Sequence, residues 1–140
     1  MSTPHIRDYQ GKHIHMIGIG GSSMGGLMSL YAAAAYNNTF SKAACLSSTI
    51  SPCFSTLARE ILRHRLDADT RMYLSWGTEE AGRAQTDESL DWLTQTARNN
   101  LAVEALLRQQ NVDTFLYCQR FGGHCEADWQ KQVPQFMNYL

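Results

Sequence analysis

The feature that most constrains the fold is a glycine-rich junction between a strand-like run and a helix-like run. Residues 14–19 read Ile-His-Met-Ile-Gly-Ile, and residues 21–25 read Gly-Ser-Ser-Met-Gly. Apolar residues then recur at helical spacing, at Leu27, Leu30, Tyr31 and Ala34. Small residues on both sides of Ser23 permit the strained strand-to-helix turn that exposes a nucleophilic serine. The pattern predicts Ser23 as a nucleophile, and its alternative is a glycine-rich turn that only packs tightly.

Composition restricts the class of protein. The 140 residues are 44% hydrophobic and 18% charged, which predicts one globular domain over residues 1–140. The net charge is −1 and the basic residues are scattered, so no nucleic-acid partner is expected. Because no apolar run approaches roughly 18 residues and the N-terminus lacks the apolar core of a signal peptide, no membrane association and a cytoplasmic location are expected.

No cofactor or metal site is expected either. Residues 18–21 read Gly-Ile-Gly-Gly, without the G-x-G-x-x-G spacing or the lysine of a phosphate-binding loop. Four cysteines lack C-x-x-C spacing, and they are Cys45, Cys53, Cys118 and Cys125. We interpret them as buried or half-buried free thiols rather than as disulfides or metal ligands.

The rest of the chain alternates between short apolar runs and longer amphipathic stretches. Strands are predicted over residues 14–19, 43–48, 71–76 and 114–119. This alternation is typical of an α/β fold, so we expect a three-layer αβα domain with a mostly parallel sheet of about four strands.

Three further helices are predicted after the junction helix. The first begins at Ser51-Pro52, with Ser51 as its N-cap, and carries an apolar stripe of Phe54, Leu57, Ala58, Ile61 and Leu62. The second extends from about residue 86 to 110, with Leu90, Leu93, Ala97 and Leu101 on one face. The last carries Trp129, Val133, Phe136, Met137 and Leu140, and Pro134 is expected to bend it or to mark a restart.

A serine nucleophile needs a base and an orienting carboxylate, and later strand ends supply both. His124 follows the last predicted strand within Phe-Gly-Gly-His-Cys-Glu, whereas the other histidines follow no later strand. The polar segment 77–87 follows the third strand and contains Glu79 and Glu80. We predict Glu80 as the acid with Glu79 in reserve; the alternatives are a surface histidine and two solvated glutamates.

These three segments resemble one branch of the α/β-hydrolases, which includes esterase D, feruloyl esterases, enterochelin esterases and mycolyltransferases. The matching segments are Gly21–Leu27, Gly77–Glu80 and Gly123–Trp129. The resemblance extends over nearly the whole chain. It implies a minimal α/β-hydrolase fold with Ser23 as nucleophile, Glu80 as orienting acid and His124 as base. The chain differs from the branch in having Glu where Asp is more usual.

A second difference is that Ser23 lies near the N-terminus, so the chain is expected to correspond to the catalytic half of a hydrolase. The Met24 N–H is the predicted oxyanion donor, but the loop that supplies a second donor in such folds has no counterpart. Losing one donor typically costs about 3 kcal/mol, so weak hydrolysis is expected. The strand over residues 14–19 would be an apolar edge, which predicts a homo-oligomer, most simply a dimer.

The sequence therefore predicts a serine carboxylesterase that hydrolyses short acyl esters through an acyl-enzyme on Ser23. Trp76 and Phe121, together with Met24, are expected to line its substrate pocket. Two alternatives remain open. The chain could be a non-catalytic binding or structural module derived from a hydrolase, or it could be one half of a split hydrolase completed by another chain.

Overall fold

The computed structural model of the chain describes residues 15–18, 24–80 and 94–140. Its helices and strands follow one another as β1 (His15–Gly18), α1 (Met24–Ala35), β2 (Lys42–Leu46), the short 3₁₀ helix η2 (Ser51–Cys53), α2 (Phe54–Arg63), β3 (Arg71–Gly77), α3 (Gln95–Gln109), β4 (Asp113–Gln119) and α4 (Glu126–Tyr139). The described strands lie close to their predicted ranges.

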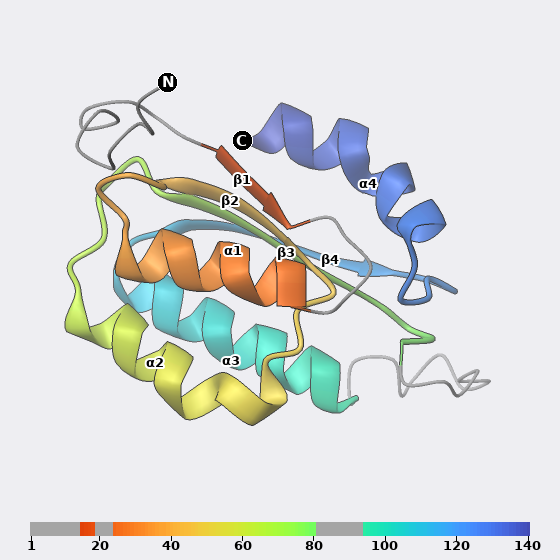
Figure 1. Ribbon diagram of the computed structural model, residues 1–140, viewed down its shortest axis with the longest axis horizontal. Coiled ribbons are helices and arrows are strands. Elements are labelled where there is room, and N and C mark those ends of the chain that lie inside the picture. The colour runs from red at the N-terminus through yellow and green to blue at the C-terminus, as the bar shows by residue number, and fades with distance from the viewer. Residues whose placement is uncertain (1–14, 19–23, 81–93) are drawn as a thin grey trace, which may run out of the picture.

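These strands form one parallel sheet in the order β1-β2-β3-β4. Each connection moves one position along the sheet in the same direction. Right-handed connections of this kind place their helices on one face. Figure 1 shows α1, α2 and α3 on that face and α4 on the other. The predicted three-layer αβα fold with a parallel sheet is therefore confirmed, and all strands end at the same edge of the sheet.

Two apolar clusters hold the layers together. On the side of α1–α3 the cluster includes Leu30, Leu57, Met72, Leu74 and Leu107. On the side of α4, Tyr73 stacks on Phe115 with ring centroids 5.4 Å apart and meets Phe136 edge-on at 5.7 Å. Side chains alternate along a strand, so β3 contributes to both clusters. Burial on both faces accounts for the largely apolar sequence of β3.

Several details of the predicted helices are wrong. Leu62 is 56% exposed and Met137 is 55% exposed, because each follows a buried or core-facing residue by one position and is rotated by about 100° on its helix. Leu101 is also exposed. The buried face of α3 instead consists of Ala97, Asn100, Val103 and Leu107. Leu90 and Leu93 lie outside the described residues.

The helix ends also differ from the prediction. Ser51 lies inside η2 rather than capping a helix, and Cys53 precedes α2. Helix α3 begins at Gln95, where the Thr94 side chain accepts a hydrogen bond from Ala97 N at 3.0 Å. Pro134 lies within α4, whose assignment continues through it to Tyr139, so the helix does not restart there.

The four cysteines are free; Cys45 is buried, and Cys53, Cys118 and Cys125 are partly exposed. Within the described segments, no helix combines the length and the apolar character needed to cross a membrane.

Helix α1 approaches β2 so closely that a side chain at Gly26 would not fit. A Cβ at this position would lie 2.2 Å from the Leu46 carbonyl oxygen and 2.6 Å from Ser48 Oγ. We therefore expect Gly26→Ala to lower the free energy of unfolding by about 1–3 kcal/mol, because the overlap outweighs the gain in helix propensity. Urea denaturation measures the change. Gly123→Ala is the control, because its Cβ would meet Asp128 Oδ2 at an ordinary 3.5 Å, and equal loss in both variants would contradict this explanation.

Candidate active site

The segments that follow β3 and β4 are joined by main-chain hydrogen bonds that continue beyond the paired strands. The Thr78 N–H donates to the Gln119 carbonyl at 3.1 Å, and the Glu79 N–H donates to the Gly122 carbonyl at 2.9 Å. The Phe121 N–H donates to Thr78 Oγ1 at 2.8 Å. The segment that carries Glu79 and Glu80 and the segment that leads to His124 therefore lie side by side at the carboxyl edge of the sheet.

Glycine is required where these segments meet. A Cβ on Gly77 would lie 2.1 Å from the Gly122 carbonyl oxygen, and one on Gly122 would lie 2.8 Å from the Gln119 side chain. Phe121, just before Gly122, has a φ of 57°. This left-handed residue turns the chain after β4 so that Gly122 can accept the Glu79 N–H.

The Glu80 carboxyl group is held on one oxygen and faces the histidine with the other. Oε1 accepts hydrogen bonds from Ser47 Oγ at 2.5 Å and from the Gly77 N–H at 2.6 Å. Oε2 lies 3.7 Å from His124 Nδ1, which is an ion-pair distance and longer than a direct N–H···O hydrogen bond. Such contacts in a free enzyme can tighten when substrate binds.

Burial dominates the electrostatics of Glu80. Its side chain is 8% exposed. Desolvation raises the pKa of Glu80, while the hydrogen bonds from Ser47 and Gly77 and the nearby His124 act to lower that pKa. A carboxylate is thus kept in a site that disfavours its charge, which is typical of functional positions.

Asp128 and Trp129 hold the histidine segment. Asp128 Oδ2 accepts the Gly123 N–H at 2.8 Å, and Oδ1 accepts from Lys131 Nζ at 2.6 Å. The hydrogen bond from Lys131 and then that from Gly123 lower the pKa of Asp128 to about 2. The His124 and Trp129 rings pack in a T-shaped arrangement with centroids 5.0 Å apart. The imidazole is 30% exposed, so one side of it remains accessible.

A cavity of about 150 Å³ opens beside Glu80 and His124. Its remaining wall comes from the segment after β2 and from the first turns of α3, and consists of Ser47, Ser48, Thr49, Ile50, Ser51, Gln95, Thr96 and Asn99. Except for Ile50, these side chains carry hydroxyl or amide groups. The cavity can therefore accommodate a small polar group next to the carboxylate and the imidazole.

Comparison with known proteins decides the family. A family model described as "Putative esterase" matches residues 5–140. The chain belongs to this esterase family. The match includes both segments described above, and it supports hydrolase activity toward esters in general terms. Neither the curated proteins nor the solved structures include a significant match to the chain.

The structure of this esterase brings some of the predicted site residues together. Glu80 and His124 face each other, whereas Glu79 is partly exposed and uses its N–H to bind the Gly122 carbonyl. Met24 is the first residue of α1, and its side chain is exposed. Ser23 lies outside the described residues.

The two predicted pocket aromatics have other surroundings. Trp76 is 1% exposed, because strand alternation places it on the same face as Met72 and Leu74, beneath the α1–α3 layer. Phe121 is 64% exposed, and the Arg120 guanidinium lies 4.9 Å above its ring. Neither residue lines the 150 Å³ cavity.

Sequence reasoning did not assign Ser47 or Trp129 to the site of the esterase. The sequence predicts Ser47 within a strand and Trp129 among the apolar residues of the last helix. The useful signal for Ser47 was its position after β2, because parallel strands end at one edge and polar residues there converge. For Trp129 the signal was its place in the segment Gly123–Trp129.

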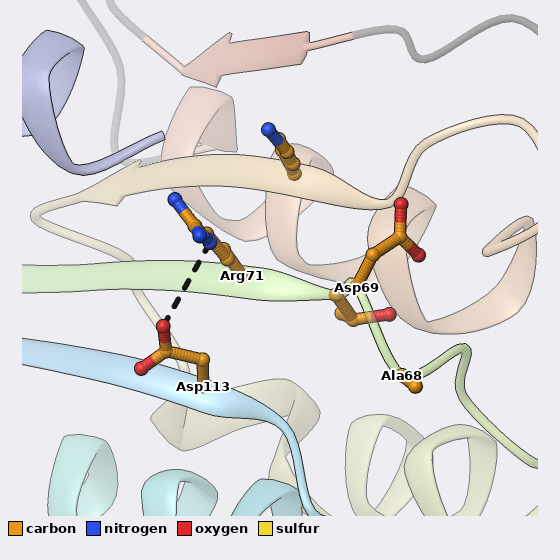
Figure 2. A pocket seen from close by; sticks show the side chains of 6 residues that line it. Ala68, Asp69, Arg71 and Asp113 are labelled. Atoms are coloured by element: carbon orange, nitrogen blue, oxygen red, sulfur yellow. Dashed lines mark ion pairs between the residues drawn. The ribbon is translucent and has the colours of Figure 1, made fainter.

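A second cavity, of about 360 Å³, lies at the opposite edge of the sheet, where the strands begin. Figure 2 shows the Arg71–Asp113 ion pair there, with 3.8 Å between Nε and Oδ2. Arg71 Nη1 also donates to the Tyr139 carbonyl at 2.9 Å, and Lys42 Nζ donates to the Leu140 carbonyl at 2.6 Å. These cations bind the last carbonyls of α4, so they fasten that helix to the sheet.

The raised pKa of Glu80 predicts how stability depends on pH. A carboxyl group whose folded-state pKa is above the unfolded value favours the fold at low pH, and that contribution is lost as the pH rises from about 4.5 through the folded-state pKa. Glu80→Gln removes this titration and keeps an oxygen for Ser47 and Gly77. We expect the difference in Tm, Glu80→Gln minus wild type, to become more positive as the pH rises from 4 to 8. A pH-independent difference would contradict the assignment.

Proposed function

We propose that this esterase is a serine carboxylesterase in which Ser23 is the nucleophile, His124 the general base and Glu80 the orienting acid. The observation that carries the proposal is the approach of Glu80 Oε2 to His124 Nδ1 at the carboxyl ends of β3 and β4. A carboxylate at Nδ1 favours the tautomer whose Nε2 can accept a proton. The family match and the sequence around Ser23 supply the remaining support.

The proposed reaction has two stages. In the first, His124 Nε2 takes the Ser23 hydroxyl proton while Oγ attacks the ester carbonyl carbon, and the imidazolium then gives that proton to the leaving alkoxide. In the second, a water molecule gives a proton to His124 while its oxygen attacks the acyl carbon, and the imidazolium then returns that proton to Ser23 Oγ as the acyl–Oγ bond breaks and the carboxylic acid leaves. Glu80 stays ionised throughout and stabilises the imidazolium.

Stabilisation of the oxyanion is the weaker part of the proposed machinery. The Met24 N–H, at the start of α1, is the proposed donor, and the positive end of the helix dipole adds to it. One donor typically contributes about 3 kcal/mol, so a chain with a single strong donor would hydrolyse esters slowly.

The proposed substrates are short acyl esters. The cavity beside His124 has a volume of about 150 Å³ and a wall rich in hydroxyl and amide groups. That size favours a short acyl or alcohol group over a long chain, and the polar wall can donate hydrogen bonds to ester oxygens.

Substitution of the two central residues tests the proposal. We expect Ser23→Ala and His124→Asn each to lower kcat/KM for p-nitrophenyl acetate by at least about a hundredfold, because each removes a group that acts as part of one unit. A fluorophosphonate probe should add one label, and peptide mapping should place it on Ser23.

The chain offers matched controls for both substitutions. His64 Nε2 lies 3.4 Å from Glu60 Oε2 on α2, so His64→Asn removes a histidine paired with a glutamate away from the proposed site. Ser55 is exposed on α2, so Ser55→Ala is the serine control. Hydrolysis that survives in Ser23→Ala, together with absence of labelling, would reject a serine esterase. Absence of both hydrolysis and labelling in the wild-type protein would favour the non-catalytic binding module.

We also propose that the chain forms a homo-oligomer, because β1 is an edge of the described sheet and an edge strand presents unpaired N–H and C=O groups. A second copy that pairs with β1 would satisfy them. Light scattering at micromolar concentration should give at least twice the 15.8 kDa chain mass. A monomer at every concentration tested would contradict this proposal.

A further inference from the structure

We propose that Ser47 and Trp129 are positioning residues that fix the Glu80 carboxylate against His124. This inference rests on the proposed function, since it assigns the means by which the acid is oriented. Its basis is a continuous set of contacts among side chains from α4 and from the segments after β2, β3 and β4.

The direction of the hydrogen bonds follows from the groups involved. The Trp129 Nε1–H can only donate, and it lies 2.7 Å from Ser47 Oγ, so the serine oxygen must accept. The Ser47 hydroxyl proton is then free to point toward Glu80 Oε1, which lies 2.5 Å away. Trp129 thereby orients Ser47 as a donor to the acid.

This arrangement assigns a separate role to each carboxylate oxygen. Oε1 receives both the Ser47 hydroxyl and the Gly77 N–H, the latter at 2.6 Å. Oε2 remains directed toward His124 Nδ1 at 3.7 Å. A glutamate has one more rotatable bond than an aspartate, so two donors on one oxygen compensate for the added freedom by holding a single rotamer.

Trp129 contacts both members of the acid–base pair. Its indole N–H reaches Glu80 through Ser47, and its ring meets His124 edge-on at 5.0 Å. The side chain is 3% exposed and lies in the cluster beneath α4. One rigid group, held by the core, therefore sets the acid and the base relative to each other.

The backbone of Ser47 supports a dedicated role. Its φ of 51° lies in the left-handed region, which residues other than Gly, Asn and Asp rarely adopt. Its N–H donates to the Ser75 carbonyl at 2.8 Å, which anchors the residue beside the end of β3. Glycine would relieve the strain at this position, so selection for stability alone would not favour serine.

The backbone strain at Ser47 allows two substitutions to separate the role of the hydroxyl group from its effect on stability. Ser47→Gly removes the hydroxyl and relieves the backbone, whereas Ser47→Ala removes the hydroxyl and keeps the strain. We expect Ser47→Gly to unfold at a higher temperature than Ser47→Ala, yet both to lose kcat for p-nitrophenyl acetate by about tenfold with little change in KM, because a charge-assisted hydrogen bond is lost. Trp129→Phe keeps a ring beside His124 and should show a smaller loss of kcat.

A pH profile separates positioning from folding. Removal of the Ser47 donor should raise the pKa of Glu80 further, and the acid limb of the kcat/KM profile should move to higher pH in both Ser47 variants. Ser75→Ala is the control, because Ser75 is buried on β3 and its Oγ has no hydrogen-bond partner among the described residues. Its profile should match the wild type.

The outcomes for the two proposals are distinct. If wild-type protein hydrolyses the ester but Ser47→Gly retains wild-type kcat and the wild-type acid limb, the positioning role is wrong while the esterase proposal stands. If wild-type protein neither hydrolyses esters nor labels at Ser23, the esterase proposal fails. In that case a ¹³C NMR titration of the Glu80 carboxyl group tests the Ser47–Glu80 hydrogen bond without any activity measurement. A titration midpoint that is the same in Ser47→Gly and wild type would overturn the positioning role.

Discussion

The candidate site depends on the pairing of β3 with β4 and on its continuation past the strand ends. Seven residue pairs join the two strands, from Arg71 with Asp113 to Gly77 with Gln119. The hydrogen bonds of Thr78 and Glu79 then extend the contact to Gly122. Because the strands are parallel, this extension places two segments that are distant in the chain side by side at the carboxyl edge of the sheet. Glu80 and His124 meet for that reason.

In the resulting site a buried carboxylate is stabilised by hydrogen bonds from its neighbours. The Glu80 carboxylate is buried, and burial alone disfavours its charge. Hydrogen bonds from Ser47 and the Gly77 N–H offset part of that cost, and the nearby imidazole of His124 offsets a smaller part. The lowered pKa of Asp128 reflects similar support for the histidine segment, in this case near solvent. Acid and base are thus each held by neighbouring side chains, Glu80 by Ser47 and the segment of His124 by Asp128.

The sequence predicted the order of elements well because periodicity is a local property. The strand ranges were legible from the apolar pattern, and the acid and histidine segments from their positions after strands. The errors lie at helix faces. Leu62 and Leu101 are apolar yet exposed, while Asn100 is fully buried and donates to the Thr96 carbonyl at 3.0 Å. Which face of a helix meets the sheet depends on the packing of its neighbours, so residue type alone predicts it poorly.

By itself, the sequence determined a mostly parallel α/β domain that resembles esterases and named Glu80 and His124 as partners, because strands and the segments that follow them are recognisable from local pattern. Only the tertiary structure decided that Glu80 binds Ser47 and that Trp129 contacts both Ser47 and His124. These contacts join the segment after β2 to α4, 82 residues further along the chain. No local pattern encodes such a contact, since it forms only when α4 packs on the sheet and brings Trp129 to the carboxyl end of β2.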